Sequence, residues 1–194
     1  MYADGKLLSA KEGIIRLNPG TWVNLNNRFG YVPLGGTKFY QEREINNDAA
    51  FFKIVIDHGE RPKENAAAHY AYAILPEVGI EETIEFSQEP SVEILAQSEA
   101  MHAVLDKETN IVGINVFESG ESLMGVKFLT PCSVIIDSDK FYITDPTQTL
   151  SEIKLEFLKD ISVASEHDVT VSGRVVTIKM PIKGKSYSFT VSEI

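Results

Sequence analysis

The stretch IVIDHGERPKENAAAHYAYAILP, residues 54–76, holds two apolar runs joined by a polar connection. The first run stops at Asp57-His58-Gly59, and the second ends on Pro76. Alternate positions of the second run form two uncharged sets: Tyr70, Tyr72 and Ile74, and Ala71, Ala73 and Leu75. Period-two alternation predicts a β-strand, and two uncharged sets predict that this strand is covered on both faces.

The Asp57-His58 pair admits a catalytic and a structural interpretation. An aspartate beside a histidine can act as an acid–base unit. Adjacent strand residues, however, point to opposite faces of a sheet, which is poor geometry for a catalytic dyad. We therefore favour a structural role, with His58 at the end of a strand and bonded to the loop backbone.

Short apolar alternations continue through the rest of the chain and predict an all-β protein of β-sandwich architecture. In EIKLEFL, residues 152–158, apolar positions alternate with charged ones, which predicts a strand with one solvated face. A turn is expected at SGR, residues 172–174, and a C-terminal hairpin is expected around PIKGK, residues 181–185. Further strands are predicted near residues 92–95, 101–105, 111–117, 123–129, 133–136 and 141–144.

A domain boundary is expected in LPEVGIEETIEFSQEPSVEIL, residues 75–95. This segment is rich in glutamate and is interrupted by Pro76, Gly79 and Pro90. Such a composition predicts an extended connection between two β modules, with the acidic run as a solvated face.

Composition excludes several classes of function. The hydrophobic content of 43% supports a real core, and the net charge of −10 disfavours nonspecific binding to nucleic acid or to anionic membranes. No apolar segment approaches the roughly 18 residues that a membrane-spanning helix needs. The first residues, MYADGKLLSAKEG, lack the apolar centre of a signal peptide. We expect no nucleic-acid partner and no membrane association.

Metal and cofactor sites are not expected either. The four histidines do not share a tight metal-ligand spacing: His58, His69, His102 and His167. In DSDKFYITD, residues 137–145, the three aspartates lack the rest of a calcium-loop pattern, which favours a polar hairpin turn. The single cysteine, Cys132, begins an apolar run and is interpreted as a buried small hydrophobe. No serine-nucleophile motif or phosphate loop is present.

The segment TWVNLNNRFGY, residues 21–31, is the main candidate for ligand binding. It supplies aromatic, amide and guanidinium groups: Trp22, Asn24, Asn26, Asn27, Arg28 and Tyr31. Sugars are often held by an aromatic face together with hydrogen-bonding side chains. The favoured alternative is structural, with a strand anchored by Trp22, a turn at Asn26-Asn27 and a second strand from Phe29.

The segment VIDHGERPKENAAAHYAYAILP resembles the characteristic segment of polysaccharide lyase family 8, the hyaluronate, chondroitin and xanthan lyases. In that family a strand ends in His-Gly, a loop with a proline follows, and the next strand reads Tyr-x-Tyr-x-x-x-Pro. The matching positions are His58, Gly59, Pro62, Tyr70, Tyr72 and Pro76. The stretches DGKLL, TWVNLNNRFGYVPL and PSVEILAQSEAMHAVLDKETNIVGINVF extend the resemblance over most of the chain.

The resemblance implies that residues 1–88 are the late strands of a large central antiparallel β-sandwich and that residues 89–194 form a small C-terminal β-sandwich. Lyases of this family degrade acidic polysaccharides by β-elimination, with catalytic residues in an N-terminal helical domain. No residue of this chain matches that catalytic motif, so we predict no catalytic residue here.

The implied function is a non-catalytic portion of such a lyase, which supports the helical domain and contributes to binding an acidic polysaccharide. The implied location is secreted or periplasmic. A stand-alone carbohydrate-binding or adhesion module is the main alternative. A small independent enzyme, with His58 or His69 beside a carboxylate, is a third.

Overall fold

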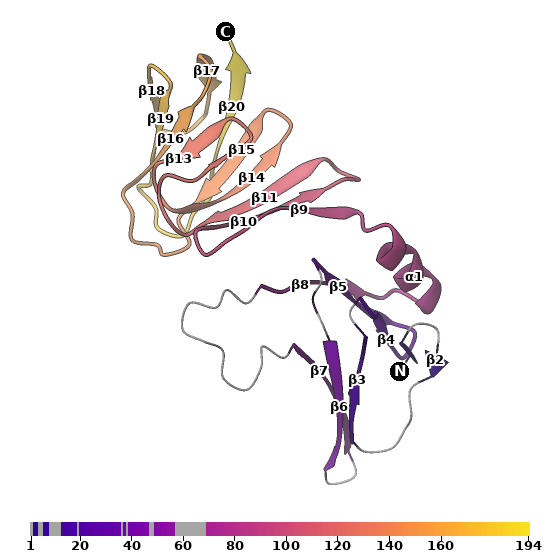
Figure 1. Cartoon of the computed structure of the whole chain (residues 1–194). Coiled ribbons are helices and arrows are strands. Elements are labelled where there is room, and N and C mark those ends of the chain that lie inside the picture. Colours follow the sequence, from indigo (N-terminus) through magenta and orange to yellow (C-terminus); the bar gives the residue numbers. More distant parts are fainter. Residues whose placement is uncertain are drawn as a thin grey trace. The chain divides into compact units, whose positions relative to one another are not determined.

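The computed structural model describes residues 2–3, 6–7, 13–18, 20–35, 37, 39–46, 49–56 and 69–194. Within these residues the secondary structure consists of strands β1 to β20 and one helix, α1. The predicted all-β fold class, with several antiparallel sheets, is confirmed. The chain divides into two compact units, Met1–Pro90 and Ser91–Ile194, which Figure 1 colours from indigo to magenta and from magenta to yellow.

The first unit contains two antiparallel sheets among its described residues, in the orders β2-β1-β4-β5-β8 and β3-β6-β7. Buried Ala3 and Val23 from the first sheet pack with Ile54 and Ile56 from the second. The strands are β1 Tyr2–Ala3, β2 Lys6–Leu7, β3 Gly13–Arg16, β4 Val23–Leu25, β5 Phe29–Leu34, β6 Phe39–Asn46, β7 Ala49–Ile56 and β8 Ala71–Pro76.

The segment predicted as an extended connection contains helix α1, Ile80–Gln88, so that prediction is wrong. At the helix start the Glu82 carboxylate accepts the Gly79 backbone N–H, and Asn27 Oδ1 accepts the Ile80 N–H at 2.9 Å. Acidic side chains in the first turn also suit the positive end of the helix dipole. The glutamate three residues after the cap is a capping-box signal that the composition-based interpretation overlooked.

Strand β8 is also less covered than the sequence predicted. Tyr72 and Ile74 are 45% and 52% exposed, whereas the alternating Ala71, Ala73 and Leu75 are partly buried. The prediction that both faces are covered is therefore wrong for the face of Tyr72 and Ile74. An uncharged strand face can be buried, but its sequence does not show whether another part of the protein packs against it.

The second unit is a sandwich of two antiparallel sheets, in the orders β17-β20-β15-β14-β11-β10-β9 and β12-β13-β16-β19-β18. All the separately predicted strands between residues 92 and 144 are present, and that predicted at 123–129 is split by a turn at Met124-Gly125. The strands are β9 Val92–Gln97, β10 Met101–Asp106, β11 Ile111–Val116, β12 Ser122–Leu123, β13 Val126–Phe128, β14 Cys132–Asp137, β15 Lys140–Thr144, β16 Glu152–Phe157, β17 Ile161–Ala164, β18 Val169–Ser172, β19 Val175–Lys179 and β20 Tyr187–Glu193.

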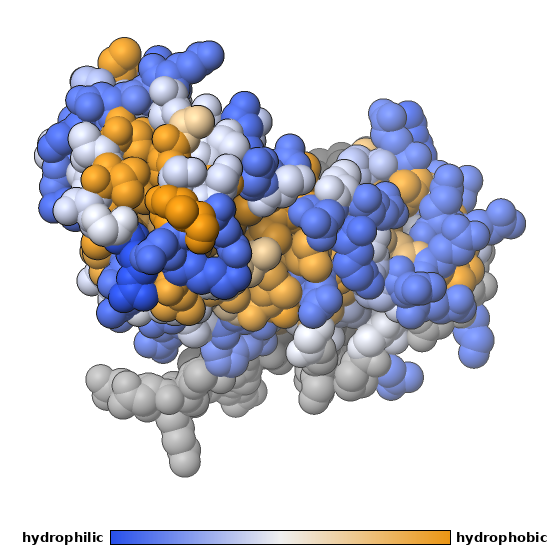
Figure 2. Space-filling model, turned by 90° about the horizontal axis from the view of Figure 1, so that it is seen from above, coloured by the Kyte–Doolittle hydropathy of each residue, from blue (hydrophilic) through white to orange (hydrophobic). Residues whose placement is uncertain are grey.

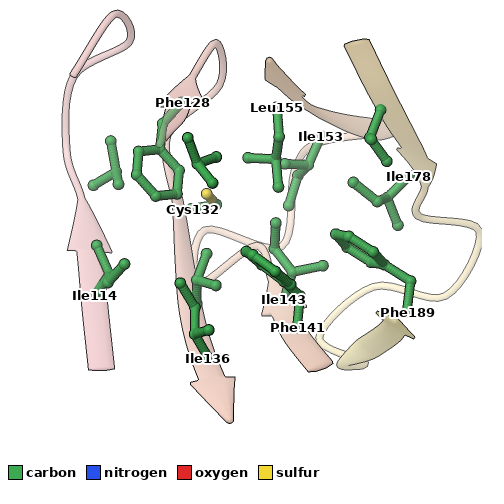
Figure 3. Close-up of a cluster of buried hydrophobic side chains, with 14 of the residues drawn as sticks. Ile114, Phe128, Cys132, Ile136, Phe141, Ile143, Ile153, Leu155, Ile178 and Phe189 are labelled. Atoms are coloured by element: carbon green, nitrogen blue, oxygen red, sulfur yellow. The ribbon is translucent and has the colours of Figure 1, made fainter. Parts of the chain in front are cut away.

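The core of the second unit lies between these two sheets. Figure 3 shows Ile114, Ile136 and Phe141 meeting side chains of the opposite sheet, including Leu155 and Ile178. Each comes from a strand in which buried residues alternate with partly buried or exposed ones, the pattern expected for an inner sandwich face. The prediction of one solvated face for residues 152–158 is thus confirmed for β16.

Cys132 lies among the side chains of the same core in Figure 3. It is 1% exposed. Burial raises the pKa of its thiol to about 12, and the nearby Asp145 charge acts in the same direction. The interpretation of Cys132 as a buried small hydrophobe is confirmed, because a thiol with this pKa does not form a thiolate near neutral pH.

The predicted C-terminal hairpin is wrong. Strand β19 pairs with β16 and β18 in one sheet, whereas β20 pairs with β15 and β17 in the other. The connection that contains PIKGK therefore crosses the sandwich, with Gly184 at φ +72°. Both strands show period-two alternation because each turns one face to the shared core, and that pattern does not reveal the sheet to which a strand belongs.

Figure 2 shows a face of the molecule on which hydrophobic residues reach the surface among hydrophilic ones. Among the described residues, no helix is long and apolar enough to cross a membrane.

Candidate functional site

The segment predicted to bind sugars forms the β4–β5 hairpin of the first unit. Val23 pairs with Tyr31, and Asn24 pairs with Gly30. The turn between the strands holds Asn26 at φ 56° and Asn27 at φ 55°, a left-handed conformation that asparagine tolerates better than most residues. The strand, turn and second strand of the structural alternative are therefore present.

The six candidate residues do not share one surface. Trp22 is 6% exposed and Asn24 is fully buried, while Asn26, Asn27 and Arg28 are exposed in the turn. Tyr31 pairs with Val23 and packs on the small core, so it lies on the sheet face opposite Asn24. The carbohydrate-binding assignment remains a prediction, and its buried members have structural roles in this chain.

Asn24 ties the hairpin to helix α1. Its Nδ2 donates to Thr83 Oγ1 at 2.8 Å, to Gly79 O at 3.0 Å and to Val78 O at 3.2 Å. Thr83 Oγ1 in turn donates to Gly79 O at 2.7 Å. Asn24 and Thr83 are both buried, so the asparagine amide serves as a local link between β4 and the first turn of the helix.

The exposed part of the same region is acidic. A hollow of about 520 Å³ beside the turn is lined by Asn27, Gly79, Ile80, Glu81, Glu82 and Glu85. Its asparagine caps the helix, and its three glutamates place negative charge around the opening. An anionic sugar would be repelled there, so this hollow is a poor site for an acidic polysaccharide.

The residues that carry the family resemblance are only partly described. His58, Gly59 and Pro62, and with them the Asp57-His58 pair, lie outside the described residues. Tyr70 and Tyr72 stack with ring centroids 6.4 Å apart and planes inclined by 18°. Pro76 ends β8 opposite Phe29.

The carboxylate of Asp145, in the second unit, accepts four hydrogen bonds and belongs to a residue that is 3% exposed. Burial raises the pKa of Asp145, but hydrogen bonds from Thr147, Leu150 and Thr149 outweigh burial and lower it to about 2. The backbone N–H groups of these three residues donate at 2.7–2.8 Å, and Thr147 Oγ1 donates at 2.6 Å. Asp145 therefore shapes the loop that joins β15 to β16.

Glu152 is held on the outer face of the smaller sheet. Hydrogen bonds from Lys154 and Lys179 lower its pKa to about 2, and the Lys154 Nζ–Glu152 Oε1 distance is 2.8 Å. Asp137 ends β14 and Asp139 lies in the two-residue hairpin turn that joins β14 to β15. Among the described residues, no three His, Cys, Asp or Glu side chains are grouped so as to hold a metal ion.

A second hollow, of about 430 Å³, lies on the outer face of the seven-stranded sheet, and sequence reasoning missed it. We call it the outer-sheet hollow. Its outward-facing residues come from four adjacent strands: Val104, Gly113, Asn115, Ser133, Ile135, Tyr142 and Thr144. The alternation in each strand marks these positions as outward-facing, but only the observed strand order brings them together.

Comparison with known families identifies the second unit. Residues 93–154 match the profile described as polysaccharide lyase family 8, C-terminal beta-sandwich domain. Hyaluronate lyase HylB of Enterococcus faecalis is 30% identical over 158 residues, which are 76% of this chain and 15% of that enzyme. Xanthan lyase of a Bacillus species is 24% identical over 189 residues, which are 90% of this chain and 19% of that enzyme.

Two solved structures share the fold. Xanthan lyase of Paenibacillus superposes with a TM-score of 0.77 and 21% identity, covering 99% of this chain and 22% of that one. Chondroitin AC lyase of Streptomyces coelicolor, solved with chondroitin sulphate, gives a TM-score of 0.69 and 15% identity, covering 95% of this chain and 27% of that one. The chain thus spans less than a third of each of these relatives.

Proposed function

We propose, on the premise that this chain carries the C-terminal β-sandwich region of polysaccharide lyase family 8, that it is a non-catalytic portion of an enzyme degrading acidic polysaccharides by β-elimination. The family resemblance itself is confirmed. The observation that carries the proposal is the extent of the match: 99% of this chain follows the fold of only 22% of the Paenibacillus xanthan lyase chain.

The chemistry of the described carboxylates supports a structural role. A general base works best when its pKa lies near the operating pH. The pKa values of Asp145 and Glu152 are both about 2, because each carboxylate is held by hydrogen bonds. These groups shape a loop and join neighbouring strands, so neither is suited to remove a proton from a sugar ring.

The partner that we propose for the chain is the catalytic helical domain of a lyase. A sandwich with a packed core is a rigid support, and rigid elements hold a substrate cleft more accurately than loops do. We place this enzyme outside the cytoplasm, in a secreted or periplasmic setting, because polymers such as hyaluronan and xanthan are too large to enter a cell intact.

The experiment is an incubation of the purified chain with hyaluronan, chondroitin sulfate and xanthan, followed by ultraviolet absorbance of the unsaturated uronate that elimination creates. Full-length hyaluronate lyase HylB serves as the positive control. We expect absorbance to rise with the control and to stay flat with this chain. Sustained turnover proportional to the concentration of this chain would overturn the proposal.

A further inference from the structure

We propose that the outer-sheet hollow binds a uronate-containing polysaccharide, with Tyr142 stacked on one sugar ring and Lys140 paired with a uronate carboxylate. The choice of an acidic sugar rests on the proposed function, whereas the geometry comes from the second unit alone. The site is separate from the Trp22–Tyr31 hairpin that the sequence suggested.

The strand register builds the floor of the hollow. Val104 pairs with Gly113, Gly113 with Ile135, and Ile135 with Tyr142, so these four residues form one row across four strands. Val104, Ile135 and Tyr142 are exposed apolar or aromatic side chains on a sheet face otherwise rich in polar residues. Tyr142, at 37% exposure, has both an accessible ring and support from its neighbours.

Gly113 creates the depression in this row. It lies inside β11 without a left-handed φ, and a Cβ added there would meet nothing within 4 Å. Glycine destabilises the interior of a strand, and where it occurs there it often marks a position that a ligand approaches closely. Neither the backbone conformation nor the packing requires glycine here, and its effect is to keep space open beside the aromatic ring.

Polar groups border the floor on one side. Asn115 pairs with Ser133, and Ser133 pairs with Thr144, which forms the adjacent row of the same face. Ser133 Oγ donates to Asn115 Oδ1 at 2.6 Å, which orients the amide. In the described chain no group accepts from Asn115 Nδ2, so its two N–H donors are available to sugar hydroxyls.

Lys140 supplies the charge. Its Nζ lies over the ring of Tyr142, a floor residue of the hollow, at 4.9 Å from the ring centroid. Three other lysines of this unit are paired with glutamates: Lys154, Lys159 and Lys179. Lys140 makes no ion pair among the described residues, so its ammonium can receive a carboxylate attached to a ring stacked on Tyr142. Asp137 pairs with Lys140 across the two strands, and its negative charge should make the binding of an anionic sugar weak. Because the attraction to Lys140 is electrostatic, binding should also decline with added salt.

The test is a nuclear magnetic resonance titration of the whole chain with a hyaluronan hexasaccharide and with the same oligosaccharide after reduction of its carboxylates. We expect saturable shifts confined to β10, β11, β14 and β15 and to their side chains, and weaker binding of the reduced sugar. Absence of saturable shifts in these strands would overturn the proposal, as would shifts that instead report self-association at the same face.

Variants separate binding from folding. Gly113→Val places side-chain atoms in the depression, and its Cβ would meet nothing within 4 Å, so it should preserve the unfolding temperature while weakening binding about tenfold. Tyr142→Ala should weaken binding roughly two- to tenfold, since a stacked ring contributes on that scale. Lys140→Gln should remove the preference for the carboxylated sugar. Tyr72→Ala, which removes a comparably exposed tyrosine from the first unit, should leave binding unchanged.

The outcomes also separate this inference from the proposed function. Cleavage of hyaluronan by the chain would refute a non-catalytic role but would leave a mapped subsite intact. Normal binding by Gly113→Val would refute the subsite but would leave the non-catalytic role intact.

Discussion

Replacing Asp145 by asparagine should destabilise the second unit although the side chain keeps its size. The carboxylate accepts backbone N–H groups from Thr147, Thr149 and Leu150 and the hydroxyl of Thr147. An asparagine amide retains one acceptor oxygen, and its NH₂ group faces donors in either orientation. At least one partly buried N–H therefore loses its acceptor, which costs about 1–3 kcal/mol, and the remaining hydrogen bonds are no longer strengthened by a full negative charge. We expect a total of about 3 kcal/mol.

Calorimetry of both proteins measures this effect directly. For a domain of this size a loss of about 3 kcal/mol lowers the unfolding temperature by roughly 12 °C or more. Trp22 is the only tryptophan and lies in the first unit, so its fluorescence follows the unfolding of that unit. Asp139→Asn makes the same chemical change at an exposed turn and serves as the control. A shift no larger than that of the control would refute the reasoning.

The pH dependence provides a second check on Asp145. Burial raises the pKa of Asp145 and hydrogen bonds lower it, with a net value of about 2 against an ordinary value of 3.8. A group whose pKa is lower in the folded state stabilises the fold above its unfolded pKa. The stability difference between the native protein and Asp145→Asn should thus be full above pH 3.8 and should shrink as the pH falls toward 2. A difference that persists unchanged at pH 2 would contradict this assignment.

Three further predictions concern other parts of the fold. Gly30→Ala places a Cβ 2.6 Å from Thr83 Oγ1 and should destabilise the first unit by about 1–3 kcal/mol, measured by denaturation followed through Trp22 fluorescence; an unchanged midpoint would show that α1 does not approach β5 this closely. Asn27→Ala removes the acceptor of the Ile80 N–H and should cost about 1 kcal/mol in the same assay, with the exposed Asn26→Ala as a control for the turn. Cys132 should react with a thiol reagent only after unfolding, because it is buried and burial raises its pKa to about 12; rapid modification of the native chain would contradict its place in the core.

The fold class could be predicted from the sequence because the alternation of apolar and polar residues is visible within each single strand. In β16, Ile153, Leu155 and Phe157 alternate with charged residues, and the structure buries those three side chains. The pairing of strands could not be predicted in the same way. β19 and β20 are neighbours in sequence with similar patterns, but they lie in different sheets because both must face one core.

The candidate sites also depend on which strands lie side by side, and the sequence does not show this. Trp22 and Tyr31 looked like parts of one platform because they are close in sequence, yet Trp22 is buried and Tyr31 packs on the small core. In contrast, Gly113 and Tyr142 are 29 residues apart and belong to strands separated by β14. No local motif joins them, so only strand order could bring them into one hollow.

The molar mass of long hyaluronan after prolonged incubation with this chain tests the central claim most directly. Light scattering during size-exclusion chromatography detects even one cut per polymer, whatever the chemistry of cleavage. The account predicts that the mass distribution stays equal to that of the polymer incubated alone, while full-length hyaluronate lyase HylB reduces it. A fall in mass that scales with the concentration of this chain and produces unsaturated ends would contradict the non-catalytic assignment.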